Sequence, residues 1–382
     1  MVRIVLVVPG GVGADGIHEV IPALLSLVRR LAGRHEVLVI ATEQVTARPS
    51  YELEGARILA LGWSRRRPIG RARVAWRMIS AIKAFQPDVI HAFWLGPAST
   101  ISIIAGRLSR VPVVASVGGG ELVALRRIGY GGARTWWGRR QADLAVRLAA
   151  ALTAGSRSAL EPVARRRRDA RWLPLGAERE AETRRSGGSP DDPLRLLVAA
   201  SINRVKGPEV ILGALVRARN ALRGDAGLSL DWLGEDTLGG SATALARALG
   251  ISDVVRLRGF RPHPAVLAAW RSADLAIQGS YHESQGVAIL EAAMAGVPAV
   301  GTSVGLVAEL AAAGPPAAVA VPVGDAAALG DAIAALARDP ARRARIAEAA
   351  RTWALAHDAD WTAASFEALY AEVIAGRGTG RP

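Results

Sequence analysis

The sequence predicts an α/β protein made of two Rossmann-like domains, each with a parallel sheet, that face each other across a cleft. A chain of 382 residues suits two or three domains of roughly 150 residues each. Short runs rich in valine and isoleucine alternate with amphipathic segments, the pattern of a parallel sheet wrapped by helices. A polar segment near the middle interrupts this alternation, which then restarts and indicates a second domain.

The first domain is expected to span residues 1–176. Its predicted strands are short apolar runs that suit burial on both faces of a sheet. They are Arg3–Val8, Glu36–Ala41, Ala56–Leu61, Asp88–Phe93, Val111–Val117 and Ala151–Ser156. Amphipathic segments between them, such as Ile17–Leu31 and Ala72–Phe85, predict helices.

The second domain is expected over residues 194–360, after a linker at 177–193 that is rich in charged residues, glycine and proline. Its predicted strands are Arg195–Ser201, Ser229–Gly234, Val254–Gly259, Leu275–Ser280, Ala299–Ser303 and Ala318–Val323. Open parallel sheets bind ligands beyond the carboxyl ends of their strands, and clefts between domains are common ligand sites. The loops that follow the strands are therefore where we expect the chemistry.

Composition limits the function classes. Because the chain has no cysteine, disulfides and thiolate metal sites are excluded. No run of about 20 apolar residues occurs, and we expect a soluble, cytoplasmic protein. The net charge is +14 and the only lysines are Lys83 and Lys206. This charge suits phosphates, anionic lipid or nucleic acid, but the clusters Arg65–Arg67 and Arg165–Arg168 lack interleaved aromatics and are interpreted as solvated faces.

A glycine-rich segment follows the first predicted strand and is expected to open a helix. Gly11, Gly13 and Gly16 match the pattern G-x-G-x-x-G, in which glycines let backbone N–H groups approach an anion closely. The acidic residue that a dinucleotide site needs after the second strand is missing. Phosphate contact is the favoured interpretation, with a nicotinamide cofactor and a plain tight turn as alternatives.

Two cations, Arg204 and Lys206, lie in a predicted turn just before a helix that Pro208 can start. Positive charge at such a turn suits a diphosphate, with lysine as a point charge and arginine as a fork. Two solvated side chains are the alternative. The scarcity of lysine in this chain favours a function for Lys206.

Two carboxylates, Glu283 and Glu291, stand eight residues apart in "ESQGVAILE". Glu283 is expected in a loop and Glu291 inside the following helix. The two carboxylates would therefore contact different parts of a ligand. Carboxylates accept hydrogen bonds from sugar hydroxyls, and the helix start at Ser284–Gly286, which includes Gln285, is expected to offer N–H groups to phosphate or sugar oxygens. Alternatively, the negative charge of Glu283 only stabilises the N-terminus of the helix, and Glu291 lies on a solvated helix face.

Together these segments resemble the family 4 glycosyltransferases, which are retaining enzymes of the glycosyltransferase B (GT-B) fold. The resemblance covers nearly the whole chain, and its most specific part is the E-x7-E segment from Glu283 to Glu291. Further parts are the glycine-rich turn and the motifs "NRVKG", "DVIHAFW", "LPLGAE" and "VVRLRGF".

The resemblance implies a role for each candidate. Glu283 would contact the donor sugar and Glu291 the ribose hydroxyls. Arg204 and Lys206 would hold the diphosphate, and the backbone near Phe260 would border the base. The last helix, residues 361–375, would pack back onto the first domain.

The chain departs from the family pattern at two positions. Ser201 stands where many relatives carry an arginine, so we take Arg204 as its substitute. Gly118 stands where many relatives carry a histidine, which leaves Glu121 as the nearest titratable group in "SVGGGE". We expect Glu121 to hold a hydroxyl or orient its loop. His91 is interpreted as a packed strand histidine.

The resemblance therefore implies a retaining glycosyltransferase that uses a nucleotide-sugar donor and an acceptor not identified by the sequence. No H-x-E-type cluster or D-x-D pair is placed as a cation site, so we expect transfer to be metal-independent. Arginines with Tyr130, Trp136 and Trp137 within residues 127–140 suit contact with an anionic membrane as well as an ordinary loop. A non-enzymatic polyanion binder and a sugar-nucleotide epimerase are the alternatives, and no nucleic-acid partner is expected.

Overall fold

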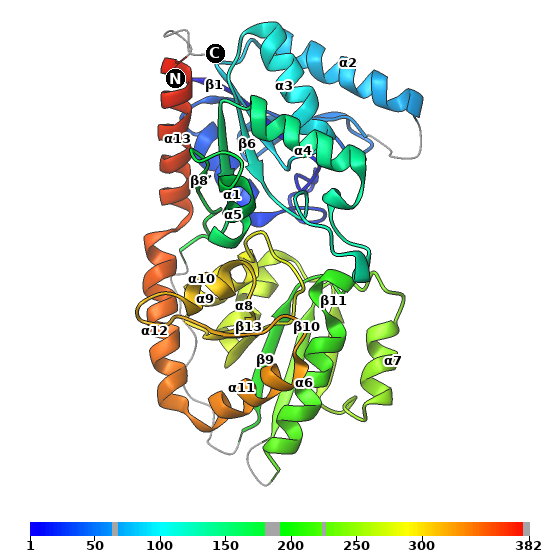
Figure 1. The fold of residues 1–382 in the computed structure, drawn as a ribbon, viewed down its shortest axis with the longest axis vertical. Helices are drawn as coiled ribbons and strands as arrows, with labels where there is room; N and C mark the ends of the chain where they lie inside the picture. Colours follow the sequence, from blue (N-terminus) through cyan, green and yellow to red (C-terminus); the bar gives the residue numbers. More distant parts are fainter. Residues whose placement is uncertain (63–67, 180–191, 224–226, 377–382) are drawn as a thin grey trace. The chain divides into compact units, whose positions relative to one another are not determined.

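The computed structural model describes residues 1–62, 68–179, 192–223 and 227–376. The chain divides into two compact units: unit 1 is Met1–Gly176 with Ala359–Pro382, and unit 2 is Ala177–Asp358. Each unit has one sheet with helices on both faces (Figure 1). The predicted fold class, α/β with two Rossmann-like parallel-sheet domains, is confirmed. The cluster Arg65–Arg67 and most of the predicted linker lie outside the described residues.

Unit 1 is built on a sheet with the strand order β3-β4-β2-β1-β5-β6-β7-β8. Its strands are β1 (Arg3–Val8), β2 (Glu36–Ala41), β3 (Ser50–Leu53), β4 (Ala56–Ala60), β5 (Val89–Phe93), β6 (Val113–Val117), β7 (Ala151–Ala154) and β8 (Arg171–Trp172). Its helices are α1 (Pro22–Ala32), α2 (Pro68–Phe85), α3 (Pro97–Ser109), α4 (Trp136–Leu148), α5 (Arg157–Ala164) and α13 (Ala359–Gly376). The edge strand β3 pairs antiparallel with β4, and the other described pairs are parallel.

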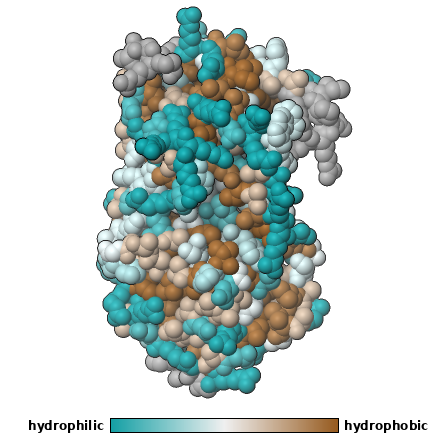
Figure 2. Space-filling view, viewed as in Figure 1, coloured by the Kyte–Doolittle hydropathy of each residue, from teal (hydrophilic) through white to brown (hydrophobic). Residues whose placement is uncertain are grey.

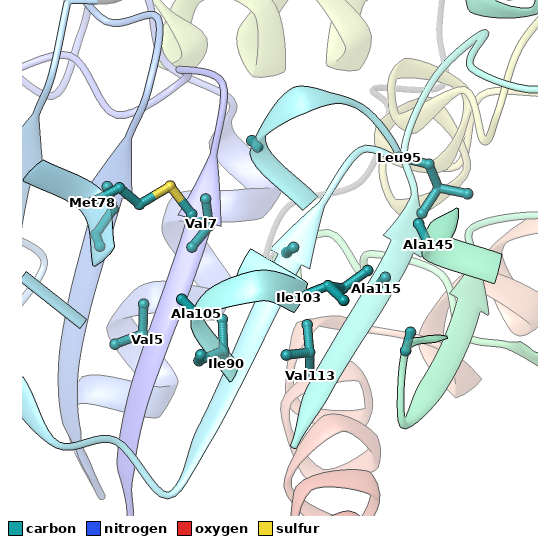
Figure 3. Close-up of a cluster of buried hydrophobic side chains, with 14 of the residues drawn as sticks. Val5, Val7, Met78, Ile90, Leu95, Ile103, Ala105, Val113, Ala115 and Ala145 are labelled. Carbon is teal, nitrogen blue, oxygen red and sulfur yellow. The ribbon is translucent and has the colours of Figure 1, made fainter. Parts of the chain in front are cut away.

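Successive residues of β1 enter two different core layers, as the pleat of a strand requires. Val5 and Val7 join the layer under α2, α3 and α4, where Figure 3 shows Met78 beside Val7. Ile4 and Leu6 join the opposite layer with α1 and α13. The helix α13 is thus part of the core of unit 1, although it follows unit 2 in the sequence.

The first helix begins later than expected. The sequence predicted a helix from Ile17, but α1 begins at Pro22. A proline disfavours helical geometry in the residue before it, and Ile21 is accordingly extended, with φ −110° and ψ 102°. The segment before it folds back on itself through bridges from Gly11 and Val12 to Val20. The glycine-rich segment therefore forms a closed loop and does not open a helix.

Unit 2 is built on a fully parallel sheet with the strand order β11-β10-β9-β12-β13-β14. Its strands are β9 (Leu194–Ala199), β10 (Leu228–Leu233), β11 (Val255–Gly259), β12 (Leu275–Gln278), β13 (Ala299–Thr302) and β14 (Val319–Val321). Its helices are α6 (Pro208–Ala221), α7 (Ser241–Ala248), α8 (His263–Ser272), α9 (Val287–Met294), α10 (Gly305–Ala311), α11 (Ala326–Arg338) and α12 (Pro340–Ala356).

The order of this sheet reverses between β9 and β12. In doubly wound sheets a crevice opens at this switch point, beyond the carboxyl ends of the two strands, and ligands bind there. One core layer lies under α6, α7 and α11, and the other lies under α8, α9, α10 and α12. The loops that follow β9 and β12 are therefore where a ligand is expected to bind.

The surface mixes hydrophilic and hydrophobic residues on the face that Figure 2 shows. Scattered apolar side chains are normal on the surface of a folded protein. Within the described part of the chain, no helix is long and apolar enough to cross a membrane.

Candidate active site

The switch point of unit 2 brings two predicted site residues together. Lys206 ends the short 3-10 helix Arg204–Lys206 that follows β9, and Glu283 lies in the loop after β12. The Nζ atom of Lys206 donates to Oε1 of Glu283 at 2.6 Å. Both side chains are only partly exposed, at 26% and 12%. Opposite charges thus meet where the fold is expected to bind a ligand.

Local hydrogen bonds fix the Lys206 loop. The side chain of Asn203 caps the 3-10 helix by accepting from the N–H groups of Val205 and Lys206, at 3.1 and 3.2 Å. The next residue, Gly207, has φ +59°, and a Cβ there would lie 2.3 Å from the carbonyl oxygen of Gly279. Glycine is thus required where the loops after β9 and β12 touch.

The Glu283 loop is held from three sides. Ser280 donates its hydroxyl to Oε1 of Glu283 at 2.7 Å, and the hydroxyl of Thr302 donates to the Ser280 carbonyl at 2.6 Å. A Cβ on Gly305, which has φ +54°, would lie 2.6 Å from the Cβ of Glu283. The loop is therefore packed against the start of α10, and the second oxygen of Glu283, Oε2, accepts no hydrogen bond from a described residue.

Glu291 lies inside α9, as predicted, and is largely buried. Its Oε1 is 2.9 Å from Nε2 of His263, the first residue of α8. An ionised carboxylate only accepts hydrogen bonds, so Nε2 is the donor. His263 was not anticipated from the sequence, because a single histidine at the start of a helix gives no periodic signal.

The other predicted donor-site residues surround this edge of the sheet. Arg204 is exposed, and its guanidinium makes no hydrogen bond or ion pair with a described residue. Phe260, just after β11, is exposed by 44%. Gly286 takes φ +94° as the N-cap of α9, while Gln285 is buried. The structure thus places all of them on loops at the carboxyl ends of β9, β11 and β12.

In unit 1, Glu121 organises a backbone loop. Its Oε1 accepts from the N–H groups of Leu95 and Gly118 at 3.0 and 3.2 Å, and Oε2 accepts from Gly119 at 2.8 Å. Burial raises the pKa of Glu121, while these backbone hydrogen bonds act in the opposite direction. The carboxylate is occupied by three donors and is suited to orienting the loop.

His91 is a packed core residue. Its Nδ1 lies 2.7 Å from the hydroxyl of Tyr370 on α13, and its Nε2 lies 2.7 Å from the hydroxyl of Ser116 on β6. Burial lowers the pKa of His91 to about 3. The ring is therefore neutral and joins α13 to the sheet.

The glycine-rich loop uses its own N–H groups. Gly11 donates to the side chain of Gln44 at 3.1 Å, Gly13 to the carbonyl of Glu19 at 3.3 Å, and Gly16 to the carbonyl of Gly13 at 3.0 Å. The expected helix N-terminus behind them is absent, because α1 begins at Pro22. Phosphate contact by these glycines stays a prediction.

No group of three or more histidine, aspartate or glutamate side chains in the described residues is arranged to hold a metal ion. Metal-independent transfer likewise stays a prediction.

Comparisons with known proteins agree with the fold. Residues 20–176 match the model of the glycosyl transferase 4-like domain, and residues 179–353 match the model of the glycosyl transferases group 1. A glycogen synthase of Mycobacterium tuberculosis is 28% identical over 98% of this chain and 94% of its own length. A D-inositol 3-phosphate glycosyltransferase of Arthrobacter is 40% identical over 31% of this chain, a match that spans 28% of that relative.

Solved structures of low sequence identity share the fold. Sucrose-phosphate synthase from Thermosynechococcus elongatus superposes with a TM-score of 0.78 at 19% identity, over 98% of this chain and 100% of that one. Anabaena HepE, solved in complex with UDP and glucose, gives 0.73 at 17% identity, over 97% and 100%. The chain is therefore a glycosyltransferase of the GT-B fold, in which a glycosyl transferase 4-like domain precedes a group 1 domain.

Proposed function

We propose that the chain is a retaining glycosyltransferase that moves a hexose from a nucleoside-diphosphate sugar to an acceptor hydroxyl. The observation that carries the proposal is the 2.6 Å pair of Lys206 and Glu283 at the switch point of unit 2. A cation suited to phosphate and a carboxylate suited to sugar hydroxyls are adjacent there, so one ligand that meets both joins a phosphate to a sugar. A solved neighbour that holds UDP and glucose supports this donor class.

We assign the donor contacts as follows. The ammonium of Lys206 has three N–H donors and gives one to Glu283, which leaves two for diphosphate oxygens. The exposed guanidinium of Arg204 adds a second cation. Glu283 accepts from Lys206 and Ser280 at Oε1, and Oε2 is assigned to a hydroxyl of the donor sugar. Glu291 is assigned to the ribose.

The transfer breaks the bond between the sugar C1 and the diphosphate oxygen. A bond from C1 to the acceptor oxygen forms on the same face of the sugar, and the acceptor proton passes to the departing phosphate oxygen. Charge develops on the diphosphate as it leaves, and cations already in place stabilise it without reorganisation. The chain therefore needs no separate base, and Glu121 is assigned a positioning role through its loop in unit 1.

Two experiments test this proposal. Thermal unfolding with a panel of nucleoside diphosphates and nucleotide-sugars identifies the donor, since a ligand at 100 times its Kd stabilises the folded protein by about 2.7 kcal/mol. NMR of the product then reports the configuration at C1, with and without a chelator of divalent metals. Retained configuration and undiminished turnover in chelator support the proposal; inverted configuration or metal-dependent turnover contradicts it.

We also propose that unit 1 contacts an anionic membrane surface. The cytoplasmic leaflet, which contains anionic lipids, is such a surface. Trp136 and Trp137 begin α4, are exposed by 51% and 69%, and stack edge to face with ring centroids 4.6 Å apart. The guanidinium of Arg140 lies 5.2 Å from the ring centroid of Trp136. Residues 122–142 contain five arginines and no acidic residue. Exposed tryptophan beside a cluster of arginines favours lipid headgroups over an ordinary loop.

A further inference from the structure

The scheme proposed above assigns no role to His263, although its Nε2 lies 2.9 Å from Oε1 of Glu291. We propose that His263 is a positioning residue that fixes the Glu291 carboxylate for the ribose hydroxyls, and so makes the site selective for ribonucleotides. The proposal rests on the donor site proposed above. It assigns a role to a residue outside the E-x7-E segment.

The backbone directs His263 toward α9. Pro262 is the N-cap of α8, with φ −56° and ψ 147°, and His263 is the first helical residue. Val266, Leu267 and Trp270 follow at three, four and seven residues and pack into the core layer that contains α9. Residues with this spacing share one face of a helix. The imidazole therefore begins the stripe of α8 that meets α9.

The carboxylate of Glu291 is held at one oxygen only. His263 donates to Oε1 at 2.9 Å, and Oε2 has no hydrogen-bond partner among the described residues. The side chain is 10% exposed, and Leu290 and Ala292 beside it are fully buried. A carboxylate in these surroundings costs free energy unless its hydrogen-bonding capacity is used. The open oxygen is suited to a hydroxyl of the ligand.

A fixed Glu291 carboxylate can distinguish ligands with a ribose hydroxyl from ligands without one. A ribose hydroxyl that donates to Oε2 completes the hydrogen bonds of Glu291, whereas a ligand without the hydroxyl leaves the oxygen unpaired. Sites built to bind a hydroxyl reject analogues that lack it much more strongly than apolar pockets do. Without His263 the carboxylate loses its fixed orientation, and we expect this discrimination to decline while contacts with phosphate and base persist.

The test compares ribose with its deoxy form. Isothermal titration measures the Kd values of UDP, ADP and GDP, each beside its 2′,3′-dideoxy counterpart. The proteins are wild type, His263→Ala, His263→Gln and Glu291→Gln. His35→Ala is the matched control, because it removes a ring from a similar pair in unit 1, where Nε2 of His35 lies 3.1 Å from Oε1 of Glu367.

For the base that binds, we expect wild type to prefer the ribonucleotide by about tenfold or more, the effect of one hydrogen bond to a charged group. His263→Ala should reduce the preference to about twofold with an unchanged Kd for the dideoxy ligand. Glu291→Gln should reduce it likewise, His263→Gln should retain most of it through its amide donor, and His35→Ala should match wild type. If His263→Ala unfolds at a lower temperature, His263→Phe, which keeps the ring without a donor, takes its place with the same expectation.

Equal weakening of both ligands by His263→Ala would overturn the proposal, because it indicates a structural role alone. An intact ribose preference in His263→Ala or in Glu291→Gln overturns it too, while the donor site itself stands. If wild type binds none of the six nucleotides, the donor site fails and the role of His263 fails with it.

Discussion

Lys206 and Glu283 lie on the two loops that flank the switch point of unit 2 and form an ion pair of 2.6 Å. The pair is mostly shielded from solvent, so it is screened less than a surface pair. Each side chain holds the other in place before a ligand arrives. The site is thus preorganised, with one oxygen of Glu283 and two N–H groups of Lys206 available to a donor.

Arg204→Ala should weaken the binding of the nucleoside diphosphate by about tenfold, as expected for one charge-assisted hydrogen bond. The midpoint of thermal unfolding should stay the same, because the guanidinium bonds to no described residue. Titration calorimetry checks the affinity, and Arg247→Ala, an exposed arginine on α7, is the control. An unchanged affinity would show that Arg204 does not replace the family arginine at position 201.

Glu121→Gln should slow transfer by about a hundredfold or less, within the usual scale of such contributions. In wild type, three backbone N–H groups donate to the Glu121 carboxylate. The glutamine amide keeps only one acceptor oxygen, and its NH₂ group faces a backbone N–H that has lost its acceptor. The loop is therefore held less firmly. Donor affinity should not change. Steady-state kinetics check this, with Glu161→Gln, an exposed glutamate on α5, as control. Complete loss of turnover would indicate that Glu121 takes part in the chemistry.

The stability of unit 1 should decline between pH 6.5 and about pH 3 because of His91. Burial lowers the pKa of His91 to about 3, whereas an unfolded histidine takes up a proton below about pH 6.5. The unfolded state therefore binds more protons in this window, and stability is lost as the pH falls, by up to about 1.4 kcal/mol per pH unit.

Denaturation at pH 7 and pH 5 checks this prediction. His91→Gln, which does not titrate, should lose less stability than wild type between the two values. Equal losses would contradict the assignment to His91.

Flotation with liposomes tests the membrane contact. We expect the protein to float with vesicles of phosphatidylserine and phosphatidylcholine at low salt, and less at high salt, because the arginines near Trp136 are screened. Replacing Trp136 and Trp137 by alanine should abolish flotation without changing donor affinity, whereas Trp76→Ala, an exposed tryptophan on α2, should not. Failure of wild type to float at low salt would favour a soluble acceptor.

Much of the fold was predictable because strands buried on both faces are continuous apolar runs. The strands Arg3–Val8 and Glu36–Ala41 have the predicted bounds. The strand Ser50–Leu53 was missed, because it is a short edge strand whose residues are exposed or half-buried. The start of α1 was misjudged, since the spacing of Ile17 and Ile21 is helical but Pro22 forces the preceding backbone to be extended.

The parts of the candidate site that lie within one short segment of the sequence were predictable. The loop position of Glu283 and the helical position of Glu291 are as expected. The partner of Glu291 was not predictable, because His263 lies 28 residues away and meets it only after α8 and α9 pack. The roles of Asn203 and Ser280 depend likewise on hydrogen bonds that the folded loops create.

The most direct test of the donor site compares the two lysines of the chain. Lys206→Ala removes the cation that faces the leaving diphosphate, and kcat/KM with the donor identified by thermal shift should fall by a few hundredfold, about 3–4 kcal/mol of lost charge stabilisation. Lys83→Ala, an exposed lysine at the end of α2, should retain wild-type activity. Equal activity of the two variants would contradict a donor site at the switch point of unit 2.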